Sequence, residues 1–255
     1  MDNKEIEQSI VLDDGYAFGK GLFETILILK EPVFLKEHIK RLNDGINLLE
    51  IDNFISEKDI REKVEELKLT NCALKIMVSE KNIIYSNRPI IYREEHYKKG
   101  FNLKVSNYKR NQFSKTTYIK SLNYLDNILE KELALREGFD EAIFLNLDNF
   151  LCEGSVSNLF VVKNKRIYTP KISSGILPGI VRNFLINGLR SKDYKVIEDI
   201  ISLEDLKNSD GAFLTNSLMG IMKINSVDGE NIKNNKIIDE IKLYYDNYIN
   251  SKYGY

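Results

Sequence analysis

Cysteine and histidine are scarce in this chain of 255 residues, which contains two of each. Cys72 and Cys152 lie far apart in strand-like stretches and lack the spacing of metal ligands, so we expect reduced, buried thiols and no metal site. His38 and His96 are too few and too poorly placed for a catalytic dyad. The sequence therefore gives no sign of a metal centre or of a catalytic histidine pair.

An excess of charge and long apolar segments are also lacking. The net charge of -1 gives no electrostatic reason to expect nucleic acid or an anionic membrane as a partner. No apolar run approaches the roughly 20 residues that span a bilayer, and the acidic residues 1–15 do not resemble a secretory signal. With 43% hydrophobic and 29% charged residues, we expect a globular cytoplasmic protein with a substantial core.

The first half of the chain mixes strand and helix patterns. Apolar periodicity predicts a helix over residues 36–49, and a capping box at Ser56-Glu57-Lys58-Asp59 predicts the start of a second helix. Strands are predicted at residues 22–29, 33–35, 72–79, 90–92 and 102–106. Because these elements lack βαβ regularity, they favour an α+β fold.

A polar segment at residues 109–118, without apolar period, is typical of a linker between two domains. After it the patterns predict a helix over residues 122–137 that ends at Gly138, and a helix over residues 180–190. Strands are predicted at residues 141–146, 158–163, 166–168, 194–199 and 212–215. A capping box at Ser202 predicts a short helix, and a final helix near residue 235 is expected to present Ile237, Ile241, Tyr244 and Tyr248 on one face.

Four segments of the second half carry residues suited to chemistry. Lys120 stands where the linker meets an apolar helix, and a lysine in a partly dry site can become a nucleophile, although most lysines are simply solvated. Glu153 precedes a Gly-Ser turn and is equally consistent with an ordinary turn carboxylate. Residues 175–182 lead into a helix N-terminus, which favours phosphate, and the hydroxyls of Thr215-Asn216-Ser217 suit the same phosphate or a plain turn.

The order and spacing of these segments match a known pattern. The stretch from Ile119 to Arg182 strongly resembles the core of the fold-type IV enzymes that use pyridoxal 5'-phosphate (PLP). Those are the branched-chain aminotransferases, the D-amino acid aminotransferases and the aminodeoxychorismate lyases. The segment FGKGLFETILILKEPVFLKEHIKRL resembles their opening motif, so the similarity covers roughly residues 11–50 and 118–228.

The resemblance implies a role for individual residues. Lys120 matches the Schiff-base lysine that also moves protons, and Glu153 matches the carboxylate that pairs with the pyridine nitrogen. Arg41 matches the arginine that binds the phosphate, on a helix that also contains His38. Further cofactor contacts are implied for Leu177 against the ring, Ile180 and Val181 through backbone N–H groups, Asn216 and Ser217 at the phosphate, and Tyr124 near the phenolic oxygen.

The resemblance also implies an α+β fold of two domains with PLP between them. The N-terminal α/β sandwich would span residues 1–108, the linker residues 109–118, and a larger pseudo-barrel with the lysine residues 119–255. A homodimer is implied as well. Two positions depart from the family pattern. Lys20 replaces a usual aspartate, and Val181 replaces a common threonine and so lacks its hydroxyl.

Three features favour aminodeoxychorismate lyase, which releases pyruvate and forms p-aminobenzoate, an intermediate of folate synthesis. They are the Phe23-Glu24-Thr25 motif, the run TNSLMGIM at residues 215–222, and a short chain without the Arg-x-His pair of the D-amino acid enzymes. An aminotransferase for branched-chain or D-amino acids is the alternative. A binding protein that has lost PLP is a third interpretation, which the retained Lys120, Glu153 and Arg41 disfavour.

For the lyase reaction, Thr25 is the candidate for proton transfer at the leaving group. A strand threonine satisfied by a neighbour is the simpler interpretation. Arg88 and Tyr92 are candidates for binding a substrate carboxylate, and a solvated loop arginine is the alternative for Arg88.

Overall fold

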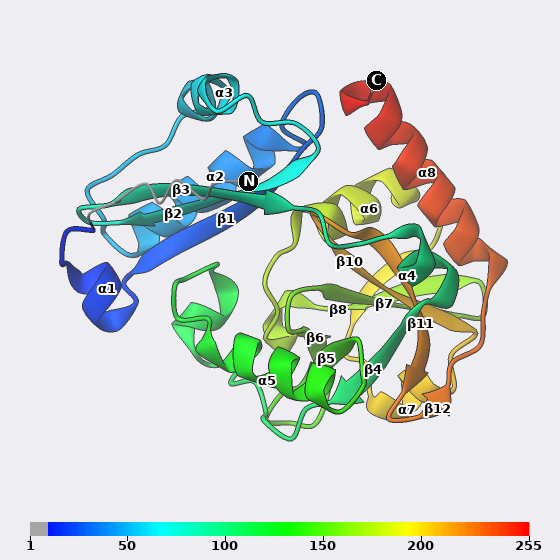
Figure 1. Cartoon of the computed structure of the whole chain (residues 1–255). Coiled ribbons are helices and arrows are strands. Elements are labelled where there is room, and N and C mark those ends of the chain that lie inside the picture. The colour runs from blue at the N-terminus through cyan, green and yellow to red at the C-terminus, as the bar shows by residue number, and fades with distance from the viewer. Residues whose placement is uncertain (1–9, 255) are drawn as a thin grey trace.

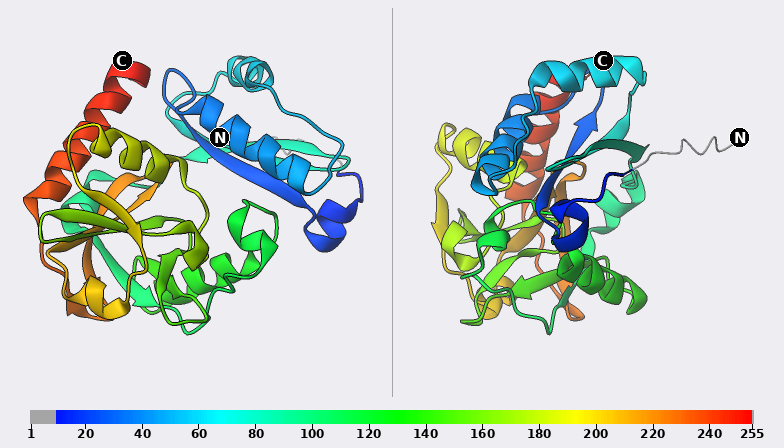
Figure 2. Two further views of the ribbon diagram at one scale, coloured as in Figure 1. Left: turned by 180° about the vertical axis from the view of Figure 1, so that it is seen from behind. Right: turned by 90° about the vertical axis from the view of Figure 1, so that its left-hand side faces the viewer.

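The computed structural model describes residues 10–254, so the first nine residues of the N-terminal stretch, predicted not to be a secretory signal, lie outside it. The smaller unit contains a sheet of order β1-β2-β3, which is antiparallel throughout. Its elements are α1 (Asp14–Phe18), β1 (Gly21–Ile28), α2 (Leu35–Leu48), α3 (Glu57–Glu66), β2 (Cys72–Ser79) and β3 (Ile83–Pro89). Figure 2 shows α2 lying along one face of this sheet.

Successive side chains of β1 and β2 point alternately to the two faces of the small sheet. Leu22 and Ile26 of β1 and Leu74 of β2 pack against α2 and α3 in one hydrophobic cluster. The intervening residues, Phe23 and Thr25 among them, point to the opposite face because successive strand side chains alternate. We call that opposite side the cleft face. The predicted capping box forms, with Ser56 accepting from the N–H of Asp59 and the Asp59 side chain accepting from the N–H of Ser56.

Two predicted strands in this half are wrong. Residues 33–35 form a turn in which Phe34 has φ of 53°, and α2 begins at Leu35. Residues 90–92 follow the end of β3; Ile90 and Tyr92 are apolar because they pack against the two cores of the larger unit. In this half, β3 was not predicted, because its side chains are largely exposed and show little hydrophobic alternation.

The larger unit is a barrel. Its strands are β4 (Phe101–Val105), β5 (Glu141–Leu145), β6 (Leu151–Gly154), β7 (Asn158–Lys163), β8 (Arg166–Pro170), β9 (Val196–Asp199), β10 (Gly211–Asn216), β11 (Gly220–Val227) and β12 (Glu230–Asn231). Within residues 10–254 the order β10-β11-β4-β5-β6-β7 closes on itself through a β7–β10 pairing, which gives a ring of six strands. The predicted α+β fold with a C-terminal pseudo-barrel is confirmed.

Helices surround the barrel (Figure 1). They are α4 (Glu94–Lys99), η1 (Lys115–Tyr118), α5 (Leu125–Arg136), η2 (Ile172–Ser174), α6 (Ile180–Arg190), α7 (Leu203–Lys207) and α8 (Lys236–Tyr253). In this unit the structure adds α4, β6, β11, β12 and the 3-10 helices η1 and η2 to the predicted elements, and the predicted capping box at Ser202 forms. No helix within the described residues combines the length and apolar character needed to cross a bilayer.

One strand crosses the predicted division of the chain. β4 falls within the predicted first domain, yet it pairs in parallel with β11 on one side and β5 on the other. By strand pairing, the chain therefore enters the barrel after β3, before residue 108. The division at residues 108 and 118 stays a prediction about folding units.

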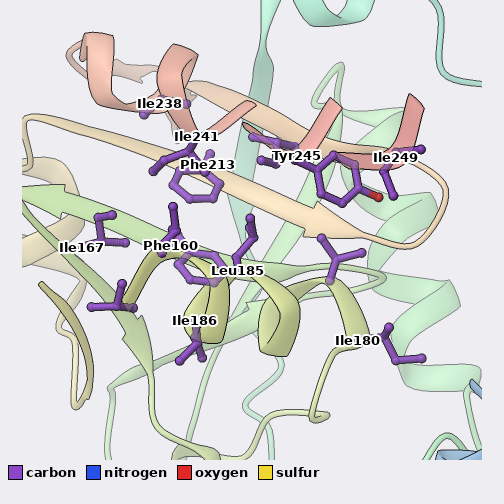
Figure 3. Packing of buried hydrophobic residues seen from close by; sticks show 14 of the residues in the cluster. Phe160, Ile167, Ile180, Leu185, Ile186, Phe213, Ile238, Ile241, Tyr245 and Ile249 are labelled. Atoms are coloured by element: carbon purple, nitrogen blue, oxygen red, sulfur yellow. The ribbon is translucent and has the colours of Figure 1, made fainter. Parts of the chain in front are cut away.

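The main core lies where α6 and α8 pack on the strands β7 and β10 (Figure 3). The rings of Phe160 and Phe213 are stacked with their centroids 4.9 Å apart. The predicted face of α8 is rotated, because its buried residues are Ile238, Ile241, Tyr245, Ile249 and Tyr253. Tyr244 and Tyr248 lie at the flank of that face, where they contact Phe184 of α6. This packing holds the N-terminal end of α6 against the barrel.

Candidate active site

A cleft of about 740 Å³ lies between the cleft face of the small sheet and the barrel. Every residue that the sequence analysis assigned to cofactor, substrate or catalysis lines its wall. They are Thr25, Arg41, Arg88, Tyr92, Lys120, Tyr124, Glu153, Leu177, Ile180, Val181, Asn216 and Ser217. The fold thus gathers residues from both units at one place, while their individual roles stay predictions.

Lys120 is fixed by the backbone of β1. Its carbonyl accepts a 2.8 Å hydrogen bond from the N–H of Phe23, and Ser121 forms a bridge with Leu22. Burial, together with the positive charge of Arg41, lowers the pKa of the Lys120 amine to about 8. Its Nζ lies 4.3 Å from the ring centroid of Phe23. A lysine with this pKa is partly neutral near pH 7, which is the form that acts as a nucleophile or base.

Glu153 is the buried acid of the cleft. It stands on β6, and its Oε2 accepts hydrogen bonds from Asn158 Nδ2 at 2.8 Å and from the N–H of Leu177 at 3.1 Å. Burial raises the pKa of this carboxyl to about 7, although the nearby Arg110 favours the charged form. The Nη1 atom of Arg110 lies 3.5 Å from Glu153 Oε1.

Arg110 is a site residue that the sequence analysis missed, because it belongs to the polar segment interpreted as a linker. The Arg110 guanidinium lies 4.5 Å from the ring centroid of Phe144, and the backbone N–H of Arg110 donates to the carbonyl of Leu145. A lone arginine among polar residues gives no signal in the sequence. Only the fold brings it beside Glu153.

The N-terminal end of α6 offers free backbone donors. Gly179 is the N-cap and has no side chain that could accept from the first turn, so the N–H groups of Ile180 and Val181 lack an intrahelical partner. Nearby, the buried Oγ1 of Thr215 has no hydrogen-bond partner within the described residues. These groups line the same cleft and suit an anion.

Arg41 approaches this anion site from α2. Its guanidinium donates to the carbonyl of Pro178, and it forms two hydrogen bonds to Glu24, at 2.6 Å from Nε and 2.8 Å from Nη2. Glu24 is fully buried and also contacts His38. From the sequence, Glu24 was noted only as part of the Phe23-Glu24-Thr25 motif, with no role of its own. An acidic residue in the middle of an apolar strand is the signal that could have marked Glu24 as a site residue.

Tyr124 and Asn216 are held by the backbone around the cleft. The Tyr124 hydroxyl donates to the carbonyl of Ser155 at 2.8 Å, and burial raises the pKa of this phenol. Asn216 Nδ2 donates to the hydroxyl of Tyr92, and its Oδ1 accepts from the backbone N–H of Met219. The Asn216 amide is therefore engaged in ordering the turn between β10 and β11.

Two cations stand on the cleft face of the small sheet. Lys75 on β2 is paired in register with Thr25 on β1, and Arg88 on β3 is paired with Ala73 on β2. Burial and the charge of Arg88 lower the pKa of Lys75. Lys75 Nζ lies 4.8 Å from the Phe23 centroid, so it is no more than about 9 Å from Lys120 Nζ. The sequence analysis missed Lys75, since a lysine in a strand is usually solvated.

These groups fit the cofactor that the resemblance implies. A buried lysine, a buried acid, an arginine and an uncapped helix N-terminus surround one cleft. The Thr215 hydroxyl, which has no partner within the described residues, lines the same cleft and is a further donor suited to a phosphate.

The family model described as amino-transferase class IV matches residues 21–227 of the chain. A Methanocaldococcus jannaschii protein provisionally named branched-chain-amino-acid aminotransferase is 31% identical over 94% of this chain and 89% of its own length. The aminodeoxychorismate lyase of Bacillus subtilis is 29% identical over 86% of this chain and 81% of its own. A Legionella pneumophila crystal structure provisionally named 4-amino-4-deoxychorismate lyase superposes with a TM-score of 0.89 at 28% identity, covering 95% and 96% of the two chains.

Proposed function

This chain belongs to the class IV aminotransferase family of PLP-dependent enzymes, and we propose that within it the chain is a 4-amino-4-deoxychorismate lyase. The substrate carries an amine at C4, a carboxylate on the ring and a second carboxylate on the enolpyruvyl group at C3. The products are p-aminobenzoate and pyruvate.

The observation that carries this proposal is the pair of cations on the cleft face. Besides burial, the charge of another cation, Arg88, lowers the pKa of Lys75, so this pair is suited to anionic groups of a ligand. A substrate with two carboxylates satisfies both cations at once. A branched-chain amino acid brings one carboxylate and an apolar side chain, which would leave either the half-buried Lys75 or the exposed Arg88 without an anionic partner.

The residues of the cleft have separate roles in the proposed reaction. When bound, PLP withdraws electrons from the carbon that bears the substrate amine, and so acidifies the proton on that carbon. Lys120 is placed to hold the cofactor and, once released, to take the C4 proton. Glu153 supplies the negative charge that keeps the pyridine nitrogen protonated. Arg41, the N–H groups of Ile180 and Val181, and Ser217 bind the phosphate.

Departure of the leaving group needs a proton donor. Thr25 stands opposite Lys75 on the cleft face, and we assign its hydroxyl to proton transfer at the C3 oxygen as the C3–O bond breaks. The electrons of the C4–H bond then complete the aromatic ring, and the C3 group leaves as the enol of pyruvate, which tautomerises to pyruvate. Lys75, Arg88 and Tyr92 hold the carboxylates during this step.

The test is formation of p-aminobenzoate from chorismate and glutamine, with an aminodeoxychorismate synthase that supplies the substrate. Rapid product formation that is lost in Lys120→Ala supports the lyase. If a yellow, PLP-loaded protein forms no product, the lyase proposal fails while the cofactor site stands.

An aminotransferase is the second candidate, and the 31% identity to the relative named branched-chain-amino-acid aminotransferase favours it. The distinguishing assay offers branched-chain L-amino acids and D-alanine to the PLP-loaded protein with 2-oxoglutarate. Oxo-acid formation faster than p-aminobenzoate formation would replace the lyase assignment.

The proposal includes a cytoplasmic homodimer. Large apolar side chains near the cleft are exposed in the single chain: Phe113, Leu125, Ile128, Leu129 and Leu135. Because Ile128 and Leu135 also line the cleft, a second copy that covers this surface would close the active site. Light scattering on the purified protein tests this assembly, and a monomer at every concentration would refute it.

A further inference from the structure

A fully buried acid lies behind the phosphate arginine. Glu24 is on the face of β1 that packs against α2, and its side chain is 1% exposed. Its carboxylate receives three hydrogen bonds: 2.6 Å and 2.8 Å from Arg41, and 2.7 Å from His38 Nδ1. The positive charge of Arg41 and these bonds overcome the cost of burial, so the pKa of Glu24 is far below its ordinary value. The carboxylate is charged at every physiological pH.

These contacts determine how Arg41 is presented. Two parallel N–H···O bonds to one carboxylate fix the plane of a guanidinium, unlike a single contact. A third N–H donates to the carbonyl of Pro178, which immediately precedes the N-cap of α6. Of the five N–H groups of the guanidinium, two remain, and the side chain lines the cleft. Glu24 therefore directs Arg41 toward the uncapped end of α6.

His38 completes the arrangement from the preceding turn of α2. Burial lowers the pKa of its imidazole despite the adjacent Glu24, so the ring is neutral and Nδ1 acts as the donor to the carboxylate. The positive charges of Arg41 and Lys120 also lower the pKa of His38, because they disfavour protonation of the ring. With a charged Glu24 and a neutral His38, the cluster of Glu24, His38 and Arg41 has no net charge.

We propose that Glu24 is a positioning residue for phosphate recognition, which acts only through Arg41 and with His38 as its support. The inference rests on the proposed phosphate contact of Arg41. An ordinary buried ion pair that only stabilises the fold is the competing interpretation. The two differ in whether loss of Glu24 affects the phosphate group selectively.

The test compares PLP with pyridoxal, which lacks the phosphate. Visible absorption titrations give the Kd of each aldehyde for the wild type, Glu24→Gln, Arg41→Gln and the double variant, which removes both charges and so avoids an unpaired buried arginine. We expect Glu24→Gln to weaken PLP about tenfold or more and to leave pyridoxal within about twofold. Glu31→Gln, which removes the partner of Arg61 in an exposed ion pair, is the matched control and should change neither Kd.

The double variant tests whether Glu24 acts on phosphate binding only through Arg41. In the Arg41→Gln background, adding Glu24→Gln should not further reduce the preference for PLP over pyridoxal. A further reduction, or equal weakening of PLP and pyridoxal by Glu24→Gln, would overturn the inference while the phosphate contact of Arg41 stands. If Arg41→Gln itself keeps the full preference for PLP, the assigned phosphate contact is wrong, and the inference falls with it.

Discussion

The cost of keeping Glu153 charged in a closed cleft can be measured directly. Burial raises the pKa of this carboxyl from 4.5 to about 7. In the unfolded chain the group ionises near 4.5, whereas in the folded protein it keeps its proton until about 7. Between these values the folded state binds more protons, so stability falls as the pH rises, and the loss is complete above about 7. A pKa difference of this size corresponds to about 3 kcal/mol.

Glu153→Gln isolates this contribution. The amide oxygen of glutamine can accept from Asn158 and Leu177 as Oε2 does, and its NH₂ group faces Arg110 at a cost that does not depend on pH. Urea unfolding of both cofactor-free proteins, from about pH 5 to pH 8, gives the difference in free energy of unfolding. We expect the free energy of unfolding of the variant, relative to that of the wild type, to rise by about 3 kcal/mol between pH 5 and pH 8.

The same titration of Glu31→Gln serves as the control, since Glu31 is half exposed. A difference between Glu153→Gln and the wild type that stays constant with pH would refute the reasoning. It would mean that the carboxyl is hydrated, or that Arg110 fully compensates its charge.

Further predictions concern other residues of the cleft. Lys120→Ala should lose the visible absorbance of the PLP-loaded protein, and PLP uptake by the wild type should accelerate as the pH rises through about 8, because the amine must be neutral; an unchanged spectrum or a pH-independent rate would contradict this. Arg110→Met should raise the pKa of Glu153 above about 7, which moves the pH range of the stability difference upward; an unmoved range would exclude the pairing. Gly179→Ala should reduce the free energy of unfolding by about 1–3 kcal/mol in urea denaturation, because a Cβ would lie 1.7 Å from Asn158 Oδ1, and wild-type stability would show that the loop gives way. Lys75→Met should raise KM for aminodeoxychorismate about tenfold with a smaller change in kcat, and an unchanged KM in steady-state assays would remove Lys75 from substrate binding.

Local signals predicted several of the elements that carry the proposed PLP contacts. The bounds of α6 and β7 agree with the periodicity, and both capping boxes form because Ser and Asp stand three residues apart before an amphipathic run. The strand β3 escaped prediction because its exposed side chains do not alternate in polarity. Residues 90–92 were misassigned because the apolar Ile90 and Tyr92 pack against the cores of the larger unit without forming a strand.

The site could be predicted where a residue belongs to a motif, and not where the fold alone supplies it. Lys120, Glu153 and Arg41 lie in segments of recognisable order. Arg110 and Lys75 do not, because nothing near them in sequence distinguishes them from solvated cations. Pairings between distant strands place both in the cleft.

The parallel pairing of β4 with β11 constrains the order in which the molecule can assemble. The two strands are more than a hundred residues apart, as the register of Ile224 with Phe101 shows. During synthesis β4 emerges early and must wait for β11, with one edge unpaired and open to other chains. Closing so long a loop is slow. The turn bearing Asn216 and Ser217 completes the cleft only at that final closure, so a half-made chain should have no working cofactor site.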